Sequence, residues 1–176
     1  LENRDTTTVP WRQNFNNSSN IDPWVTINPQ TNSEAWKITS ASSGNGPNNI
    51  ATIQTSASGE SYWLGTPIFD LTVSSQASLF FDYAIGTISP STKLKVLASD
   101  DAGETYQEVW SETGPALSSV SVGEANPTSA NDFVRKYINL TDFAGSEKNE
   151  VRLAFVLEGG RVGDSPLYLD NIELFL

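Results

Sequence analysis

The feature that most constrains this chain is its succession of short, β-prone segments, each closed by turn-forming residues. Segments rich in Val, Ile, Thr, Tyr, Phe and Trp recur along most of the 176 residues, and Gly, Pro, Asn, Asp or Ser ends each one. Helical periodicity is nearly absent. This pattern is typical of an antiparallel sandwich or barrel with many strands. The sequence therefore predicts an all-β fold.

Hydrophobic alternation locates the strands. It is clearest over residues 93–99, where Lys93 and Lys95 alternate with apolar side chains that are expected to face the core. Residues 79–81, by contrast, are apolar on both faces, which predicts a strand covered on each side by two packed sheets. The expected strands are 24–28, 35–40, 49–55, 61–64, 77–85, 93–99, 105–111, 133–140, 150–157 and 167–176.

Turn residues separate these strands. Asp100, Asp101 and Gly103 lie between two alternating runs and predict a tight hairpin whose acidic side chain accepts turn N–H groups. Residues 114–132 lack a strand pattern and predict a long surface loop. Residues 142–145 predict a single helical turn. We find no internal repeat and no linker that would divide the chain.

Composition excludes several chemistries. The chain has no cysteine and no histidine, so disulfides, thiolate nucleophiles, Ser-His-Asp triads and imidazole metal ligands are excluded, and any metal must be held by oxygen. Ten basic against 21 acidic side chains leave a net charge of −11, which argues against nucleic acid or an anionic membrane as partner. The sequence contains no run of about 18 apolar residues, the length that a helix needs to span a bilayer. We expect an exported protein, extracellular or on the cell surface, whose signal segment is not part of this stretch.

Several short motifs follow one another in a characteristic order. They are Trp11-Arg12-Gln13-Asn14-Phe15-Asn16, Asp22-Pro23-Trp24, Trp36, the runs 62–71 and 79–83, the Asp100 hairpin, the runs 138–140, 143–145 and 151–155, and Leu169-Asp170-Asn171-Ile172. Together they resemble the cleaved-adhesin, or choice-of-anchor J, type of jelly-roll domain of secreted and surface proteins of Bacteroidetes, which is similar in layout to the MAM domain.

The resemblance covers residues 11–176 and implies an antiparallel jelly-roll β-sandwich. It also implies a module that binds glycan, protein or matrix rather than an enzyme. We therefore expect a flexible N-terminal tether over residues 1–8, a single jelly-roll domain over 9–176, and a monomer.

The same resemblance implies a structural calcium ion. In such domains a first-strand acid, loop carbonyls and a last-strand aspartate hold the metal. Asp170 matches the last-strand position, whereas Asn16 stands where the family usually has Glu. Ca²⁺ accepts carboxylate, amide and carbonyl oxygens, so Asp170 and Asn16 are the candidate metal ligands. The alternative is that Asp170 hydrogen-bonds only a turn beside the last strand.

Tryptophans are the candidate sugar-binding residues, because sugar rings stack their C–H faces on exposed aromatic rings. Of the five tryptophans, Trp11, Trp63 and Trp110 are the predicted ligand contacts. Trp24 and Trp36 fall in strand-like runs, as do Trp63 and Trp110, and this placement favours core or rim packing as the alternative.

Arg161 and Asp164 are further candidate ligand contacts, at the rim of the sandwich, because the connection 159–164 joins two strong strand patterns.

The overall prediction is a non-catalytic binding module, with a carbohydrate as the leading candidate for its ligand. A protein- or matrix-binding adhesin domain is the alternative, and a structural spacer is a third possibility.

A small glycosidase that uses two carboxylates is the competing enzymatic hypothesis. Asp170 and Glu173 are expected on opposite faces of one strand, which disfavours that pair. Glu104, Glu108 and Glu112 are spaced to share one strand face and are expected to form a solvated edge.

Overall fold

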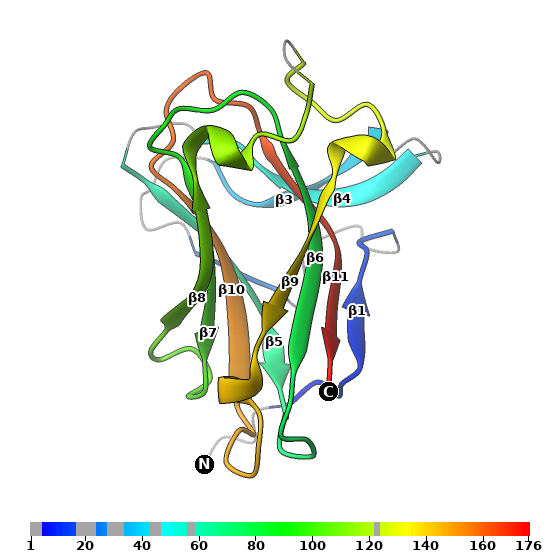
Figure 1. Cartoon of the computed structure of the whole chain (residues 1–176), viewed down its shortest axis with the longest axis vertical. Coiled ribbons are helices and arrows are strands. Elements are labelled where there is room, and N and C mark those ends of the chain that lie inside the picture. Colours follow the sequence, from blue (N-terminus) through cyan, green and yellow to red (C-terminus); the bar gives the residue numbers. More distant parts are fainter. Residues whose placement is uncertain (1–4, 17–23, 28–33, 43–46, 56–58, 122–123) are drawn as a thin grey trace.

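The computed structural model of the protein describes residues 5–16, 24–27, 34–42, 47–55, 59–121 and 124–176. Within these ranges the chain forms two antiparallel sheets that pack face to face (Figure 1). One sheet has six strands in the order β3-β4-β11-β6-β9, with β1 also paired to β11, and the other has five in the order β2-β5-β10-β7-β8. The predicted antiparallel jelly-roll β-sandwich is confirmed.

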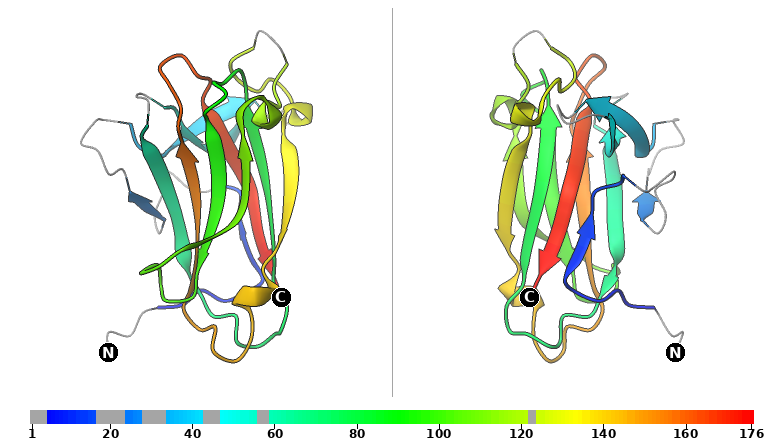
Figure 2. Two further views of the ribbon diagram at one scale, coloured as in Figure 1. Left: turned by 60° about the vertical axis from the view of Figure 1, so that its left-hand side comes forward. Right: turned by 90° about the vertical axis from the view of Figure 1, so that its right-hand side faces the viewer.

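The strands of the two sheets alternate along much of the chain. The six-stranded sheet contains β1 (Trp11–Gln13), β3 (Lys37–Ser42), β4 (Pro47–Ile53), β6 (Ser78–Ile85), β9 (Val134–Asn139) and β11 (Leu167–Phe175). The five-stranded sheet contains β2 (Val25–Ile27), β5 (Ser61–Phe69), β7 (Lys93–Ser99), β8 (Gln107–Thr113) and β10 (Val151–Glu158). Figure 2 shows β1 beside β11, the last strand.

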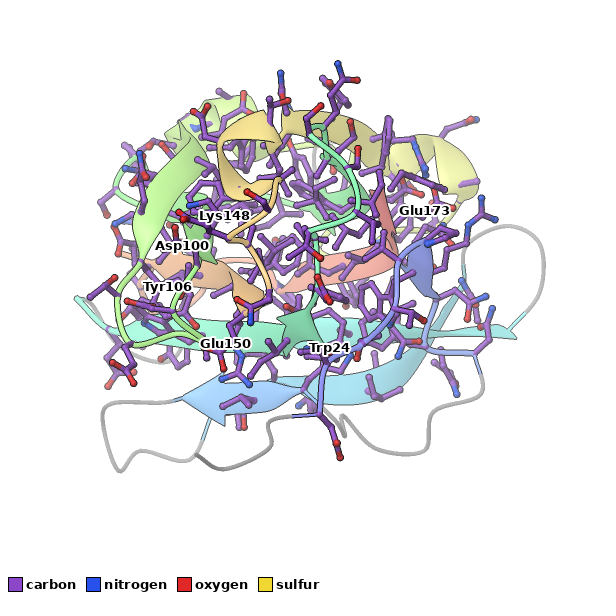
Figure 3. The ribbon with its side chains drawn as sticks, turned by 90° about the horizontal axis from the view of Figure 1, so that it is seen from below. Trp24, Asp100, Tyr106, Lys148, Glu150 and Glu173 are labelled. Atoms are coloured by element: carbon purple, nitrogen blue, oxygen red, sulfur yellow. The ribbon has the colours of Figure 1, made fainter. Side chains whose placement is uncertain are left out.

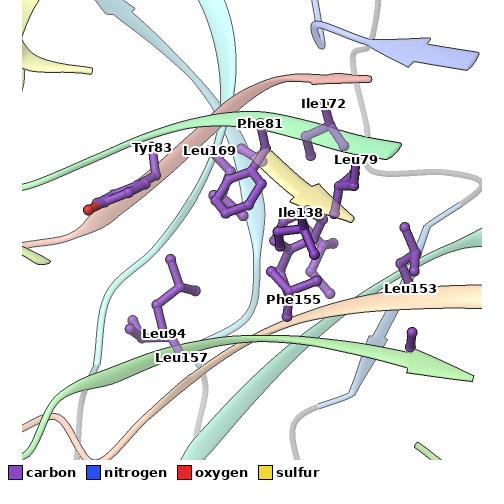
Figure 4. Close-up of a cluster of buried hydrophobic side chains, with 14 of the residues drawn as sticks. Leu79, Phe81, Tyr83, Leu94, Ile138, Leu153, Phe155, Leu157, Leu169 and Ile172 are labelled. Carbon is purple, nitrogen blue, oxygen red and sulfur yellow. The ribbon is translucent and has the colours of Figure 1, made fainter. Parts of the chain in front are cut away.

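The core lies between the sheets because each strand turns alternate side chains inward. Leu94 and Val96 of β7 are fully buried, as the alternation predicts. Phe81 of β6 meets Phe155 of β10 across the interface, with ring centroids 5.1 Å apart (Figure 4). Each such large apolar side chain contributes about 1.5–3 kcal/mol when it is buried, so the inter-sheet layer holds the fold together.

The prediction that residues 79–81 are covered on both faces is wrong for Phe80. Leu79 and Phe81 face the other sheet and are fully buried, whereas Phe80 faces outward and is half-buried. Its cover comes from the neighbouring rings of Tyr137 and Phe175, at centroid distances of 5.2 and 6.0 Å. In a fold of two layers, no third layer covers the outer face of a sheet, so an outward-facing ring such as Phe80 is covered only by side chains of neighbouring strands.

β5 continues past its predicted end at residue 64 and reaches Phe69, so that Gly65 and Pro67 lie within the strand. The register with β10 shifts between Arg152 and Ala154, which marks a bulge. Pro67 has no N–H to donate, and the Thr66 hydroxyl accepts the Leu153 N–H at 3.0 Å. The bulge thus accommodates Thr66 and Pro67 within the strand.

The predicted turns are confirmed. Asp101 accepts hydrogen bonds from the Thr105 N–H at 2.9 Å and from the Ser99 hydroxyl at 2.6 Å. The described residues of the loop 114–132 hold two short 3₁₀ helices, η1 (Gly114–Leu117) and η2 (Ala130–Asp132). The predicted helical turn is the 3₁₀ helix η3 (Thr141–Phe143).

Contacts of the N-terminal segment begin within the predicted tether. The Thr7 N–H donates to the Ile68 carbonyl at 2.7 Å, in an isolated parallel bridge to β5. Residues 1–4 lie outside the described ranges. In the described part of the chain, no helix is long and apolar enough to cross a membrane.

Candidate functional site

The outer face of the five-stranded sheet carries a row of small and apolar side chains. β5, β10 and β7 place Gly65, Ala154 and Leu97 side by side across the sheet. Ala154 and its neighbour Val156 are buried although they face away from the core. Larger side chains must therefore cover them.

Trp63 and Tyr106 supply this cover. Trp63 comes from β5 and Tyr106 from the turn before β8, and both rings pack against the cluster formed by Leu97, Ala154 and Val156. The ring centroids are 5.4 Å apart and the ring planes are inclined by 66°. Both side chains are half-buried, so each ring lies partly on the sheet and partly in solvent. We call these five residues the aromatic corner.

Local hydrogen bonds and a glycine hold the two rings in place. The Trp63 indole N–H donates to the Ser61 hydroxyl at 3.3 Å. Gly103 has φ +98°, and a Cβ there would lie 2.8 Å from the Tyr106 hydroxyl. Only glycine adopts this backbone conformation readily and leaves room for the phenol.

The hairpin that carries Tyr106 is fastened to the neighbouring turn. Lys148 forms an ion pair with Asp100, and the Ala102 N–H donates to the Glu150 carbonyl at 2.8 Å. Figure 3 shows Tyr106, Asp100, Lys148 and Glu150 at the same end of the sandwich. The position of Tyr106 therefore depends on a rigid turn.

Charged side chains border the aromatic corner on one side. Lys93 and Lys95 of β7 pair with Glu108 of β8, at 3.2 and 3.9 Å, and Lys95 also pairs with Glu158 of β10. A hydrogen bond from Ser111, and then the lysines, lower the pKa of Glu108. Exposed ion pairs contribute only about 0–1 kcal/mol to stability, so these groups mainly supply hydrogen-bond donors and acceptors at the surface.

Arg152 lies at the other end of the corner, on β10. Its Cδ is 3.9 Å from the Cβ position of Gly65 and 3.2 Å from that of Gly103. Burial raises the pKa of the Tyr106 phenol, and the nearby positive charge of Arg152 opposes this shift. The Nε of Arg152 is buried and has no hydrogen-bond partner in the described ranges.

The structure places Trp11, Trp24 and Trp36 in or against the core rather than on an outer face. Trp24 and Trp36 are 5% and 4% exposed, which confirms core packing. Trp11 is half-buried and packs on Trp24 and Phe69, at centroid distances of 5.6 and 5.1 Å. As a ligand contact, Trp11 stays a prediction.

Trp110 points between the sheets, at the edge formed by β8 and β9. Its ring is 5.7 Å from that of Phe81, and the Lys136 ammonium lies 5.4 Å from its centroid. Lys136 also pairs with Glu112 at 2.8 Å. A role of Trp110 in ligand contact stays a prediction, at a place separate from the aromatic corner.

Arg161 and Asp164 lie together in the β10–β11 connection, at the end of the sandwich opposite the hairpin (Figure 1). Asp164 is buried, and its carboxylate accepts hydrogen bonds from the Ser89 N–H at 3.0 Å and the Thr92 hydroxyl at 2.6 Å. These bonds hold the connection to the loop before β7. The Arg161 side chain is exposed, and its contact with a ligand stays a prediction.

Asp170 lies where β1 and β4 meet on β11. β4 pairs with Leu167–Leu169 and β1 pairs with Ile172–Leu174, which leaves Asp170 between them. The Asn48 amide donates to the Asp170 carboxylate at 2.7 Å. Asn16 is nearby in the fold, because its side-chain oxygen accepts the Asn49 N–H of β4 at 3.1 Å.

The charge of Asp170 is poorly compensated. Burial raises its pKa to about 6, and the negative charge of Asp82 adds to the increase, while hydrogen bonds from Asn171 and Asn48 oppose it. A cation would stabilise this buried carboxylate. The oxygens of Asp170, Asn48 and Asn16 are of the kind that Ca²⁺ prefers, so these residue types suit the metal. The Asn48 NH2 group faces Asp170 in the structure, so Asn48 would have to turn its amide to bind the ion. Among the described residues, no three acidic side chains gather around one point.

The prediction that Asp170 and Glu173 lie on opposite faces of β11 is wrong. Asp170 is opposite Asp82 and Glu173 is opposite Phe80, two positions on the same face of β6. A bulge between them, where Asn171 has φ 47°, adds a residue and restores the shared face.

A bulge also changes which face of β8 each of its glutamates occupies. β8 has a bulge that places Glu108 opposite Leu97 on the outer face and Glu112 opposite Leu94 on the inner face. The expected shared face is therefore wrong for this pair, while Glu104 is exposed, before the strand.

Tyr106, Arg152 and Asn48 were not predicted as site residues. The sequence does hold a signal for Trp63, because Tyr62 and Leu64 flank it and are buried, so alternation turns Trp63 outward. Tyr106 and Arg152 carry no comparable signal, since only the pairing of distant strands brings them to Trp63.

The comparisons with known proteins agree with the architecture. No protein-family model and no curated protein matches the sequence. Solved structures do match. The K1 cleaved adhesin domain of Lys-gingipain from Porphyromonas gingivalis is similar over 93% of this chain and 96% of that one, with 17% identity and a TM-score of 0.66.

Two carbohydrate-binding modules are similar to nearly the same extent. TmCBM61, in complex with β-1,4-galactotriose, matches over 93% of this chain and 94% of that one, with 16% identity and a TM-score of 0.60. CBM27-1 of Caldicellulosiruptor saccharolyticus, in complex with mannohexaose, matches over 93% and 95%, with 15% identity and a TM-score of 0.60. By its fold, this chain is a jelly-roll β-sandwich of the kind found in cleaved adhesin domains and carbohydrate-binding modules.

Proposed function

We propose that this protein is an extracellular, non-catalytic binding module that takes carbohydrate at the aromatic corner. The observation that carries the proposal is the half-buried pair of Trp63 and Tyr106 on an outer sheet face. The inclined rings let a sugar stack on one ring while its edge meets the other. Lys95, Glu108 and Glu158 lie within the same face, where they can bond sugar hydroxyls.

The comparisons support an oligosaccharide as the ligand class. TmCBM61 and CBM27-1 share the fold and were solved with β-1,4-galactotriose and with mannohexaose. A site with two aromatic rings and a few hydrogen bonds is expected to bind with a Kd on the order of 10 μM to 1 mM, or about −4 to −7 kcal/mol.

Calorimetric titration with a panel of β-linked oligosaccharides tests the proposal. We expect Trp63→Ala to weaken binding roughly tenfold, the equivalent of ~1.4 kcal/mol, because it removes one stacking surface. Tyr137→Ala removes an exposed aromatic ring from the opposite sheet and is the matched control, expected to bind like the wild type. Trp63→Phe keeps the cover over Ala154 if the alanine variant loses stability.

Two results would overturn the proposal. One is the absence of binding to every oligosaccharide in the panel. The other is a folded Trp63→Ala variant that binds as tightly as the wild type.

A protein or matrix ligand is the second candidate, and the outer face of the six-stranded sheet favours it. Tyr137 is 56% exposed there, beside Phe80 and Phe175. Arg135 lies 5.4 Å from the Phe80 centroid and Arg12 lies 5.4 Å from that of Phe175. Tyrosine and arginine are enriched in the energetic centres of protein interfaces. In this case Tyr137→Ala reduces binding and Trp63→Ala does not.

We also propose a structural Ca²⁺ at the junction of β1, β4 and β11. Asp170, Asn48 and Asn16 would hold it. When bound, the ion would neutralise the buried carboxylate and join the three strands. The absence of a Ca²⁺-dependent change in melting temperature would contradict this.

The glycosidase alternative now has a specific set of acids to test. Asp82, Asp170 and Glu173 share one face, but Arg135 pairs with both Asp82 and Glu173. We expect no new reducing ends when the protein is incubated with the oligosaccharides that it binds. Their appearance, and their loss in Glu173→Gln, would replace the binding proposal with an enzymatic one.

A further inference from the structure

Within the described part of the chain, Arg152 is the cation beside the aromatic corner that has no acidic partner. The other cations of this face, Lys93 and Lys95, are both paired with glutamates. Among the described residues, Arg152 takes part in no ion pair, and its Nε is buried without a hydrogen-bond partner. The Arg152 side chain does hydrogen-bond the Tyr106 hydroxyl, but this partner is neutral. In a chain with 21 acidic and 10 basic side chains, a half-buried arginine whose positive charge faces no acid can still pair with the anionic group of a ligand.

The surroundings of Arg152 place its charge at the sugar-stacking rings. Its Cδ lies 3.2 Å from the Cβ position of Gly103, and the same Cβ position lies 2.8 Å from the Tyr106 hydroxyl. The Arg152 charge also acts on the Tyr106 phenol. A ligand that contacts the Tyr106 ring is therefore next to the guanidinium.

Glycines on both sides leave room for the arginine side chain. Gly65 of β5 and Gly103 of the hairpin are its neighbours across the face. A side chain at Gly103 would meet the arginine Cδ at 3.2 Å as well as the phenol. The two glycines thus leave space for the Arg152 side chain on this face of the sheet.

We propose that the glycan taken by the aromatic corner carries a carboxylate, that of a uronic-acid residue, and that Arg152 pairs with it. This inference rests on the proposed function of the corner. A guanidinium presents parallel N–H donors that match the two oxygens of a carboxylate. The carboxylate would supply the acidic partner that the described residues do not.

The charge of the molecule favours an isolated carboxylate over a densely sulfated polymer. The net charge is −11, and Glu108 and Glu158 border the corner. A polyanion would be repelled by these charges over the Debye length of ~8 Å at physiological salt. A single carboxylate beside Arg152 gains the local attraction with less of this repulsion.

The test compares matched pairs of ligands that differ only in the carboxylate. We would titrate the protein with a galacto-oligosaccharide that carries one galacturonic acid residue and with its methyl ester, and with a glucuronic-acid-substituted xylo-oligosaccharide and its carboxyl-reduced form. The wild type is expected to bind at least one acidic form about tenfold more tightly than its neutral partner, because a charge-assisted pair forms. The preference is expected to decrease with added salt.

Variants then assign the preference to Arg152. We expect Arg152→Gln to reduce the affinity for the acidic form to that for the neutral form, and Arg152→Lys to keep part of the preference. Lys37→Gln removes an exposed cation from β3 of the other sheet and is expected to change neither affinity. The comparison of ligands with the wild type alone tests the inference even if Arg152→Gln fails to fold.

The outcomes separate this inference from the proposed function. Equal affinities for acidic and neutral forms, with both lost in Trp63→Ala, would overturn the carboxylate proposal and leave the sugar site standing. No binding of any oligosaccharide, acidic or neutral, would overturn both. An acidic preference that survives in Arg152→Gln would also overturn the role of Arg152.

Discussion

Asp170 is a buried carboxylate whose protonation is coupled to folding. Its pKa in the folded chain is about 6, above the ordinary value of 3.8, because burial and the charge of Asp82 disfavour the ionised form. A raised carboxyl pKa favours folding when the group is protonated. This contribution is complete below about pH 4 and is lost as the pH rises through about 6.

Replacing Asp170 by Asn should therefore change how stability depends on pH. In metal-free buffer we expect Asp170→Asn to exceed the wild type in free energy of unfolding at pH 8 by up to about 3 kcal/mol, from a shift of about two pKa units. The difference should shrink towards pH 4. Urea denaturation of both proteins in EDTA measures it, and a difference that is the same at both pH values would contradict the coupling.

Calcium gives a second test at the same residue. We expect millimolar Ca²⁺ to raise the melting temperature of the wild type at pH 8, because a ligand that binds only the folded state stabilises it. Asp170→Asn should show little or no increase. Differential scanning calorimetry with Ca²⁺, with Mg²⁺ as the control ion and with EDTA tests this, and an equal increase in the variant would place the ion elsewhere.

Gly103 is a residue where backbone conformation and side-chain space both require glycine. Gly103→Ala would put a methyl group 2.8 Å from the Tyr106 hydroxyl at φ +98°. We expect a loss of about 1–3 kcal/mol in the free energy of unfolding and weaker oligosaccharide binding, because Tyr106 must move. Gly145→Ala, at φ +121° with open space around it, controls for the backbone effect and should leave binding intact. Equal binding losses in both variants would contradict the role of Tyr106.

At the scale of elements, the Asp101 hairpin couples a folding turn to the proposed site. Asp101 accepts hydrogen bonds from Ser99 and Thr105, and these bonds lower its pKa well below its ordinary value. The same hairpin carries Tyr106. Its stability and the geometry of the aromatic corner are therefore linked.

Asp101→Ala should lower both the melting temperature and the affinity for oligosaccharide, because the turn loses its acceptor. Asp100→Ala, which removes only an exposed ion pair with Lys148, should have a smaller effect on each. Melting curves and titrations of the two variants measure the difference. A binding affinity unchanged in a folded Asp101→Ala protein would show that the hairpin does not position the site.

The elements also show how much of the fold and site can be predicted from sequence. The alternation of residues 93–99 predicted β7 with the bounds that the structure shows, since period-2 patterning is local. β1 was not predicted as a strand, because three residues are too few for a period. The bulges in β5, β8 and β11 could not be predicted, because a bulge depends on the register of a distant partner strand.

The candidate site, too, depends partly on local sequence patterns and partly on the pairing of distant strands. The outward direction of Trp63 is a local property of the Tyr62-Trp63-Leu64 alternation. The meeting of Trp63 with Tyr106 and Arg152 is a property of the sheet order β5-β10-β7-β8. Local patterns therefore predict which side chains are available, and the topology decides which of them form a site.

At the scale of the whole molecule, the two sheets enclose one continuous core and leave two outer faces with different surfaces. One face carries the aromatic corner and lysine–glutamate pairs. The other carries Phe80, Tyr137 and Phe175 beneath two arginines. Mutations in the core should affect both faces together, whereas mutations on one face should leave the other unchanged.

A ¹⁵N-HSQC titration of the intact protein with the tightest-binding oligosaccharide of the panel tests the central claim most directly, because it shows which face responds. The account predicts shifts in the Trp63 indole N–H and in the amides of Leu97, Ala154 and Tyr106, with the amides of Phe80 and Tyr137 unmoved. Shifts confined to Phe80 and Tyr137, or none at saturating sugar, would contradict it.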